Sequence, residues 1–150
     1  MNKGALGTRT ICQVAIVTDD IASCAKKWAD ILGVDVPEIR QTGAQEQSHA
    51  QYHGCPTPAH AKLAFFDLGQ VRLELIEPDA GPSTWREFLD THGPGLHHIA
   101  FRVQGMDDVL QRLDEKGIPL VQKGNYPGGR YAYLDASSTL GAVLELLENA

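Results

Sequence analysis

The sequence contains one pattern twice, and this repeat constrains the fold more than any other feature. The segment ICQVAIV (residues 11–17) is echoed by LHHIAFRV (residues 96–103), and RLELIE (residues 72–77) is echoed by VLELLE (residues 143–148). Internal self-similarity is typical of a fold built from copies of one supersecondary unit. The chain is therefore expected to consist of two related halves.

Alignment of the two halves brings four polar residues into equivalent positions. Gln13 falls opposite His98, and Glu74 falls opposite Glu145. Each half thus offers one residue from its first repeated segment and one from its last. We interpret the four residues as ligands of one metal ion held between two half-sites.

Hydrophobic periodicity and turn residues predict the same element order, βαβββ, in both halves. The expected fold is α+β, a single domain over residues 1–150 with modules at residues 10–77 and 96–148 joined by a linker helix within 78–95. In the first half, Asp19 or Asp20 can cap a helix that ends at Gly33. The remaining expected boundaries are strands 11–17, 62–67, 70–77, 96–103, 118–122, 130–135 and 142–147, a helix capped by Asp107 and ending at Gly117, and a linker helix capped by Ser83 or Thr84.

Most of the difference in length between the halves lies in residues 38–60. A segment of this length inside a compact repeat is often a lid or a binding loop, and equally often a mobile surface excursion. His49, His53 and His60 lie in it, and a second metal cluster there is a weak alternative to solvated histidines.

Composition restricts the class of protein. The chain has 150 residues, is 43% hydrophobic and carries a net charge of −6 without any Lys/Arg cluster, which argues against nucleic acid and anionic membranes as partners. No apolar run approaches the roughly 18 residues of a membrane span, and no signal peptide is evident, so a cytoplasmic protein is expected. The three cysteines, Cys12, Cys24 and Cys55, are expected to be reduced thiols.

Strand alternation tests the ligand hypothesis. Gln13, His98 and Glu145 each share a strand face with small or apolar residues, and a carboxylate on such a face is costly to bury unless it is paired, protonated or bound to a cation. A hydrogen-bonded core histidine and a glutamate that reaches solvent or an arginine such as Arg72 or Arg102 are the simpler interpretations for single residues. Neighbours on a strand point opposite ways, so only one of His97 and His98 can face the site, and His98 is preferred.

The chain resembles the vicinal oxygen chelate superfamily, the group of glyoxalases, bleomycin-resistance proteins and extradiol dioxygenases. The resemblance covers essentially residues 10–148, and it implies two βαβββ modules that form a curved mixed sheet around a metal-binding cup. Within the group, LELIEP (residues 73–78) and PSTWREFLDTHGPGLHHIAFRV (residues 82–103) are most similar to methylmalonyl-CoA epimerases. On this resemblance the metal ligands fall on Gln13, Glu74, His98 and Glu145.

Two positions depart from the epimerase pattern. Epimerases of this type usually carry His where this chain has Gln13, and they place a catalytic Glu on the strand that reads KLAFFD here. The set Gln, Glu, His, Glu instead resembles the zinc site of one class of glyoxalase I, whose final Glu also transfers the proton. A lactoylglutathione lyase of this kind is therefore the first alternative.

The donor set itself predicts a mechanism. Two carboxylates, one amide oxygen and one imidazole suit a divalent Co, Zn, Ni or Mn ion. Such an ion can act as a Lewis acid that stabilises the enediolate formed when a proton leaves the carbon next to a carbonyl. Glu145, or its repeat partner Glu74, is the expected catalytic base, because KLAFFD supplies no independent acid.

The sequence therefore predicts a metal-dependent isomerase or epimerase that acts on a small molecule, such as a CoA thioester or a glutathione adduct. An extradiol dioxygenase is disfavoured because Gln13 replaces one histidine of its usual iron site. A metal-free small-molecule binding protein of the bleomycin-resistance kind is the second alternative. A homodimer is expected, and the site could be completed within one chain or across a dimer. Arg40, Lys62, Lys123 and Arg130 are candidate rim charges for an anionic tail.

Overall fold

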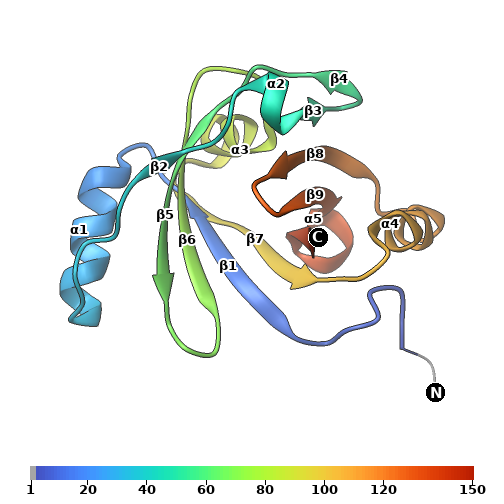
Figure 1. Cartoon of the computed structure of the whole chain (residues 1–150), viewed down its shortest axis with the longest axis horizontal. Helices are drawn as coiled ribbons and strands as arrows, with labels where there is room; N and C mark the ends of the chain where they lie inside the picture. The colour runs from blue at the N-terminus through green and yellow to red at the C-terminus, as the bar shows by residue number, and fades with distance from the viewer. Residues whose placement is uncertain (1–2) are drawn as a thin grey trace.

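A computed structural model describes residues 3–150 of the chain as one strongly curved mixed sheet with helices around it (Figure 1). The first half contributes β1 (Ile11–Val17), α1 (Ile21–Leu32), β2 (Arg40–Gln41), α2 (Gln45–Ser48), β3 (Gln51–Tyr52), β4 (Cys55–Pro56), β5 (Ala61–Asp67) and β6 (Arg72–Pro78). The linker helix is α3 (Thr84–His92). The second half contributes β7 (Gly95–Arg102), α4 (Met106–Glu115), β8 (Leu120–Tyr126), β9 (Gly129–Ala136), α5 (Ser137–Leu140) and β10 (Ala142–Asn149).

The strand pairings reproduce the sequence repeat. The order across the sheet is β2-β5-β6-β1-β7-β10-β9-β8-β3-β4. Strand β1 runs parallel to β6, its equivalent β7 runs parallel to β10, and an antiparallel β1–β7 pair joins the halves. The predicted α+β fold with a curved mixed sheet is confirmed, and the four strands expected to carry the site lie side by side at its centre.

Helix α1 begins and ends as predicted. The side chain of Asp20 accepts a hydrogen bond from Ser23 N, and Gly33 adopts a left-handed conformation with φ of 70°. Both residues satisfy backbone groups that a helix end leaves unpaired. The buried face of the helix packs against β5 and β6, which places α1 outside the curve of the sheet (Figure 1).

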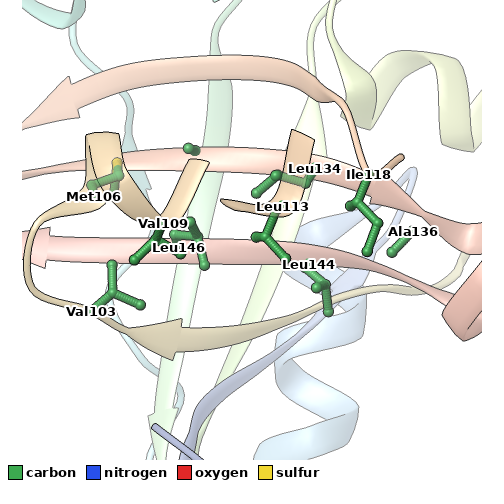
Figure 2. Close-up of a cluster of buried hydrophobic side chains, with 10 residues drawn as sticks. Val103, Met106, Val109, Leu113, Ile118, Leu134, Ala136, Leu144 and Leu146 are labelled. Carbon is green, nitrogen blue, oxygen red and sulfur yellow. The ribbon is translucent and has the colours of Figure 1, made fainter. Parts of the chain in front are cut away.

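Helix α4 begins differently from the prediction. Asp107 is not its N-cap: the helix starts after Gly105, and the first backbone N–H groups donate to Glu148 Oε2 of β10. A carboxylate from a distant strand replaces a local cap, which the local sequence could not indicate. Val109 and Leu113 then pack on Leu134, Leu144 and Leu146 in the core of the second half (Figure 2).

Residues 38–60, which we term the bridging segment, form both edges of the sheet. Strand β2 pairs with β5 at one edge, whereas β3 pairs with β8 and with β4 at the other. Figure 1 shows this segment running from the edge beside β5 to the edge beside β8. The side chain of Tyr52 also donates a hydrogen bond to Glu87 of α3. The segment, for which a lid or binding loop and a mobile surface excursion were the alternatives, thus connects the two halves through short paired strands.

Helix α3 packs on the concave face of the sheet. Ser83 caps it, and Trp85 and Leu89 lie buried in one cluster with Ala15, Ile76 and other concave residues. Throughout residues 3–150, no helix is both long enough and apolar enough to cross a bilayer.

Candidate metal centre

The four predicted ligands lie on four adjacent central strands and point into the concave face. Gln13 is on β1, Glu74 on β6, His98 on β7 and Glu145 on β10. The strand register aligns them: Ala15 pairs with both Glu74 and His98, and Ala100 pairs with both Gln13 and Glu145. Ala15 and Ala100 are themselves repeat-equivalent and fully buried. Small residues between the polar side chains leave space at the centre of the sheet for these side chains to converge.

The carboxylates and the imidazole converge closely. His98 Nε2 lies 3.1 Å from Glu145 Oε1 and 3.5 Å from Glu74 Oε1. One ligand atom from each of these three residues lies within 4.8 Å of the other two. Two donors on opposite sides of a divalent ion with bonds of about 2.1 Å are about 4.2 Å apart, so the spacing suits a bound ion.

Gln13 presents its amide nitrogen, not its oxygen, to this trio. The Nε2 atom donates to Glu74 Oε1 and to Glu145 Oε1 at 3.1 Å each, and it lies 3.5 Å from His98 Nε2. Its Oε1 atom accepts from Arg72 at 2.9 and 3.2 Å. Ligation through the amide oxygen therefore requires the amide to turn and Arg72 to release it.

Burial is the main influence on the pKa values of the trio, Glu74, His98 and Glu145. It raises the pKa of Glu145 to about 8, although Tyr133 and Arg72 act in the opposite direction. It also raises the pKa of Glu74 well above the ordinary value, with the charge of Glu145 adding to the effect. Burial lowers the pKa of His98 to about 3, so this imidazole is a neutral ligand at physiological pH.

These residues fit a divalent cation. Two carboxylates with raised pKa values and a neutral imidazole surround one point that a hydrogen-bond donor, the Gln13 amide, now fills. A divalent ion at that point would neutralise both carboxylates and relieve the cost of burying them. Within residues 3–150, this is the one group of three or more His, Cys, Asp or Glu side chains with a metal-ligand spacing.

His97 is buried as well, contrary to the expectation that neighbouring histidines point to opposite faces. The register between β1 and β7 shifts between Ala15 and Ile16, and the resulting irregularity places His97 at an extra position. Its Nδ1 lies 2.8 Å from His98 Nδ1, and its ring packs edge-on against Tyr133 and Phe88. Sequence alternation assumes a regular ladder, so it could not reveal this second histidine behind the ligand.

One end of the cup is filled by aromatic and apolar side chains. Trp85 Nε1 donates to the hydroxyl of Tyr133 at 3.1 Å, and Tyr131 accepts from Gln122 Nε2 at 3.1 Å. Tyr133 is 2% exposed, so it packs in the core, whereas Tyr131 is partly exposed. This end excludes water from the trio.

The other predicted polar residues do not gather at the site. Three of the proposed rim cations form ion pairs elsewhere: Arg40 with Glu38, Lys62 with Glu77, and Arg130 with Glu148 and Asp107. Lys123 lines a pocket of about 240 Å³ beside α4, together with Arg130 and Tyr131.

His49, His53 and His60 form no metal-spaced group among the described residues. His60 instead contacts the Thr42 carbonyl oxygen through Nδ1. The three cysteines are free thiols, as predicted.

With this geometry in place, the family can be assigned. The sequence model of the Glyoxalase/Bleomycin resistance protein/Dioxygenase superfamily matches residues 12–133. The chain belongs to this superfamily. The similarity to the superfamily expected from the repeated segments is therefore confirmed.

Three relatives illustrate the position of the chain within the superfamily. An uncharacterized protein of Bacillus subtilis is 37% identical over 91 residues, which cover 57% of this chain and 64% of that protein. The mitochondrial methylmalonyl-CoA epimerases of Mus musculus and Bos taurus are 25% and 26% identical, covering 70% and 91% of this chain and 52% and 72% of theirs. The match thus spans less than two thirds of the length of the Bacillus and mouse proteins.

A solved structure supports the same fold. The methylmalonyl-CoA epimerase of Mycobacterium tuberculosis aligns with all of this chain and 93% of its own, with a TM-score of 0.65 and 22% identity. The superfamily fold is thereby confirmed for the described residues.

Proposed function

We propose that the chain is a metal-dependent epimerase of a malonyl-type CoA thioester, which removes and returns a proton next to a carbonyl group. The observation that carries the proposal is the buried trio of Glu74, His98 and Glu145, placed by the two-fold repeat at the centre of the cup. Similarity to methylmalonyl-CoA epimerases supports the choice of substrate class.

Glu74, His98 and Glu145 would hold a Co, Zn, Ni or Mn ion, and Gln13 would join them if its amide turned. Bound there, the ion would supply Lewis-acid chemistry to a substrate carbonyl oxygen. His98 is poised as a neutral ligand, and contact with His97 Nδ1 holds its ring orientation. The low exposure of the trio strengthens each electrostatic contact with a reacting carbonyl.

The base in this proposal is a carboxylate of the trio. Glu145 accepts the proton from the carbon next to the carbonyl and then returns it, and Glu74 is its repeat-equivalent alternative. The role of Glu145 is supported by its position, since its Oε1 lies 3.1 Å from His98 Nε2 in the trio that would hold the ion, and it would detach from the ion to take up the proton. The strand β5 carries no glutamate that could act in its place.

The first test measures metal content by mass spectrometry on protein purified without chelator or a nickel column. About one divalent ion per chain, lost in Glu145→Ala and kept in Glu77→Gln, would support the site. Glu77 is a suitable control because it lies on the same strand as Glu74 but contacts Ile21 N and Lys62 instead. Absence of bound metal, even with excess Co, Mn, Ni or Zn, would favour the metal-free binding protein.

The second test measures exchange of the substrate α-proton with solvent deuterium. Glu145→Gln is expected to lower the rate of exchange on methylmalonyl-CoA by about 100-fold or more while keeping much of the metal. Near-normal exchange in this variant would contradict the role of Glu145, and the same measurement on Glu74→Gln decides between the two carboxylates.

Glyoxalase-type isomerisation is the second candidate function. The observation that favours it is the Gln, Glu, His, Glu set, in which Gln13 replaces the histidine expected of epimerases. Turnover of the glutathione hemithioacetal of methylglyoxal, with no exchange on methylmalonyl-CoA, would support this candidate. A homodimer also stays a prediction, which light scattering in solution can test.

A further inference from the structure

The end of the cup opposite Trp85 is exposed and positively charged. Arg72 lies two residues before Glu74 on β6, and Arg102 lies four residues after His98 on β7. Because strand residues alternate between faces, each arginine shares the concave face with its ligand neighbour. Exposure rises from the buried trio to these two residues, both of which are exposed. This end of the cup is therefore exposed to solvent, whereas the trio itself is buried.

Neither arginine has a carboxylate partner in the part of the chain that the structure describes. Among residues 3–150, ion pairs engage Arg40, Arg86 and Arg130, but none engages Arg72 or Arg102. Arg72 forms no ion pair among the described residues. Its side chain is held in place by hydrogen bonds to Gln13 and by stacking over the Phe65 ring at 4.3 Å.

Cys12 lies between the arginines and the trio. A register shift between Ile11 and Gln13 makes it an extra residue in β1, and its Sγ contacts the Ala100 carbonyl oxygen at 3.4 Å. The thiol lies within electrostatic range of Arg102, Arg72 and Glu145. It is half-buried, so it can report on this end of the cup.

We propose that Arg72 and Arg102 form a receptor for an anionic group of the ligand, a carboxylate or a phosphate, at the open end of the cup. A divalent ion held by Glu74 and Glu145 would balance their charges, so the two guanidinium groups would supply the uncompensated positive charge for this group. Arginine suits this role because its planar fork can bind a carboxylate or phosphate oxygen pair. The proposal rests on the proposed function for the bound ion and for the identity of the ligand.

The direct test measures binding of CoA thioesters to the metal-loaded protein by calorimetry. Arg102→Gln is expected to raise the Kd of methylmalonyl-CoA by about tenfold or more, since hydrogen bonds to charged groups are of this strength. Arg102→Lys should restore part of the affinity. Lys123→Gln is the control, because this exposed lysine projects from the face of β8 opposite the inward-facing Gln122. A change below twofold in Arg102→Gln would overturn the receptor.

Comparison of two ligands identifies the source of the anionic group. If Arg102→Gln weakens methylmalonyl-pantetheine as much as methylmalonyl-CoA, the receptor binds the carboxylate. If it weakens only the CoA thioester, the receptor binds a phosphate of the carrier. Propionyl-CoA lacks the carboxylate, so Arg102→Gln should weaken its binding only if the receptor binds a phosphate.

A second experiment needs no substrate and separates this proposal from the proposed function. The thiols are alkylated with anionic iodoacetate or neutral iodoacetamide, and peptide mass spectrometry follows Cys12, with exposed Cys55 as the internal control. The rate with iodoacetate divided by the rate with iodoacetamide should be several-fold higher at Cys12 than at Cys55, and Arg102→Gln should reduce this difference.

The outcomes of these experiments distinguish the two proposals. Anion preference at Cys12 in a protein that binds no CoA thioester would reject the proposed substrate and keep the receptor. Equal ratios at Cys12 and Cys55 would overturn the receptor. Failure of Cys12 to react with either reagent would show that this end is closed, which also overturns it.

Discussion

At one end of the cup, Trp85 and Tyr133 are buried and hydrogen-bonded to each other; at the other, Arg72 and Arg102 are exposed and lack acidic partners among the described residues. The carboxylates and the imidazole of the candidate metal centre lie between the two ends. Along the same strands, one end of the cup is thus occupied by packed side chains and the other is accessible to solvent. We expect substitutions at the closed end to lower stability and substitutions at the open end to affect binding.

The largest expected effect on stability is that of Trp85→Ala. Trp85 is 5% exposed, and truncation of a buried tryptophan costs about 3–5 kcal/mol of unfolding free energy. Urea denaturation of the metal-free protein measures this cost. Arg102→Ala, the open-end control, should change stability by less than about 0.5 kcal/mol. Similar losses in both variants would contradict the division between the ends.

The second prediction concerns pH and the trio itself. The folded chain holds Glu145 protonated up to a pKa of about 8, whereas in the unfolded chain this residue ionises near its ordinary value of 4.5. The raised pKa of Glu145 therefore contributes to stability, and this contribution is present in full below about pH 4.5. The contribution is lost as the pH rises through 8, at a slope of up to about 1.4 kcal/mol for each pH unit.

The lowered pKa of His98 has the opposite effect on stability, because it destabilises the folded state only as the pH falls below 6.5. Between about pH 6.5 and 8, the metal-free protein should therefore lose stability, as urea denaturation at several pH values would show. Glu145→Gln should reduce the slope but not abolish it, because burial also raises the pKa of Glu74, and a saturating divalent ion should reverse it. A flat profile in the unmodified metal-free protein would contradict the raised pKa.

A smaller effect is expected for Tyr133→Phe, which leaves the buried Trp85 Nε1–H without its acceptor. An unsatisfied buried donor costs about 1–3 kcal/mol. Tyr126→Phe is the matched control at the open end, where the hydroxyl donates to exposed Asn149 and water can replace it. Chemical denaturation should show the larger loss in Tyr133→Phe, and an equal loss in the two variants would argue against a dry closed end.

The smallest effect is expected at the bridging segment. Tyr52→Phe removes the hydrogen bond to Glu87, an exposed contact worth less than about 1 kcal/mol of global stability. Local opening should increase nonetheless, so limited proteolysis should cleave residues 38–60 faster while the rest of the chain stays resistant. Unchanged cleavage would show that the strand pairs alone hold the segment.

The sequence predicted the parts of the site that depend on repetition. Four equivalent positions indicated Gln13, Glu74, His98 and Glu145, and regular strand registers bring their side chains together. The direction of the Gln13 amide could not be predicted because it depends on Arg72, which lies elsewhere in the sequence.

Features set by irregular or distant contacts escaped prediction. A shifted register buried His97, and Glu148 replaced the local cap of α4. Three of the four rim cations predicted from the sequence, Arg40, Lys62 and Arg130, are paired with acidic residues, whereas Arg102 was identifiable only once the exposed end of the cup was known.

The bridging segment also has a consequence for the order in which the chain folds. Residues 51 and 52 pair with residues 122 and 123 of β8, so the far edge of the sheet cannot form until most of the second half has been synthesised. The first half leaves the ribosome with β3 paired only to its neighbour β4, and non-local pairing such as that with β8 slows folding. Pairing at this edge of the sheet is therefore a late step, which requires the second copy of the repeat.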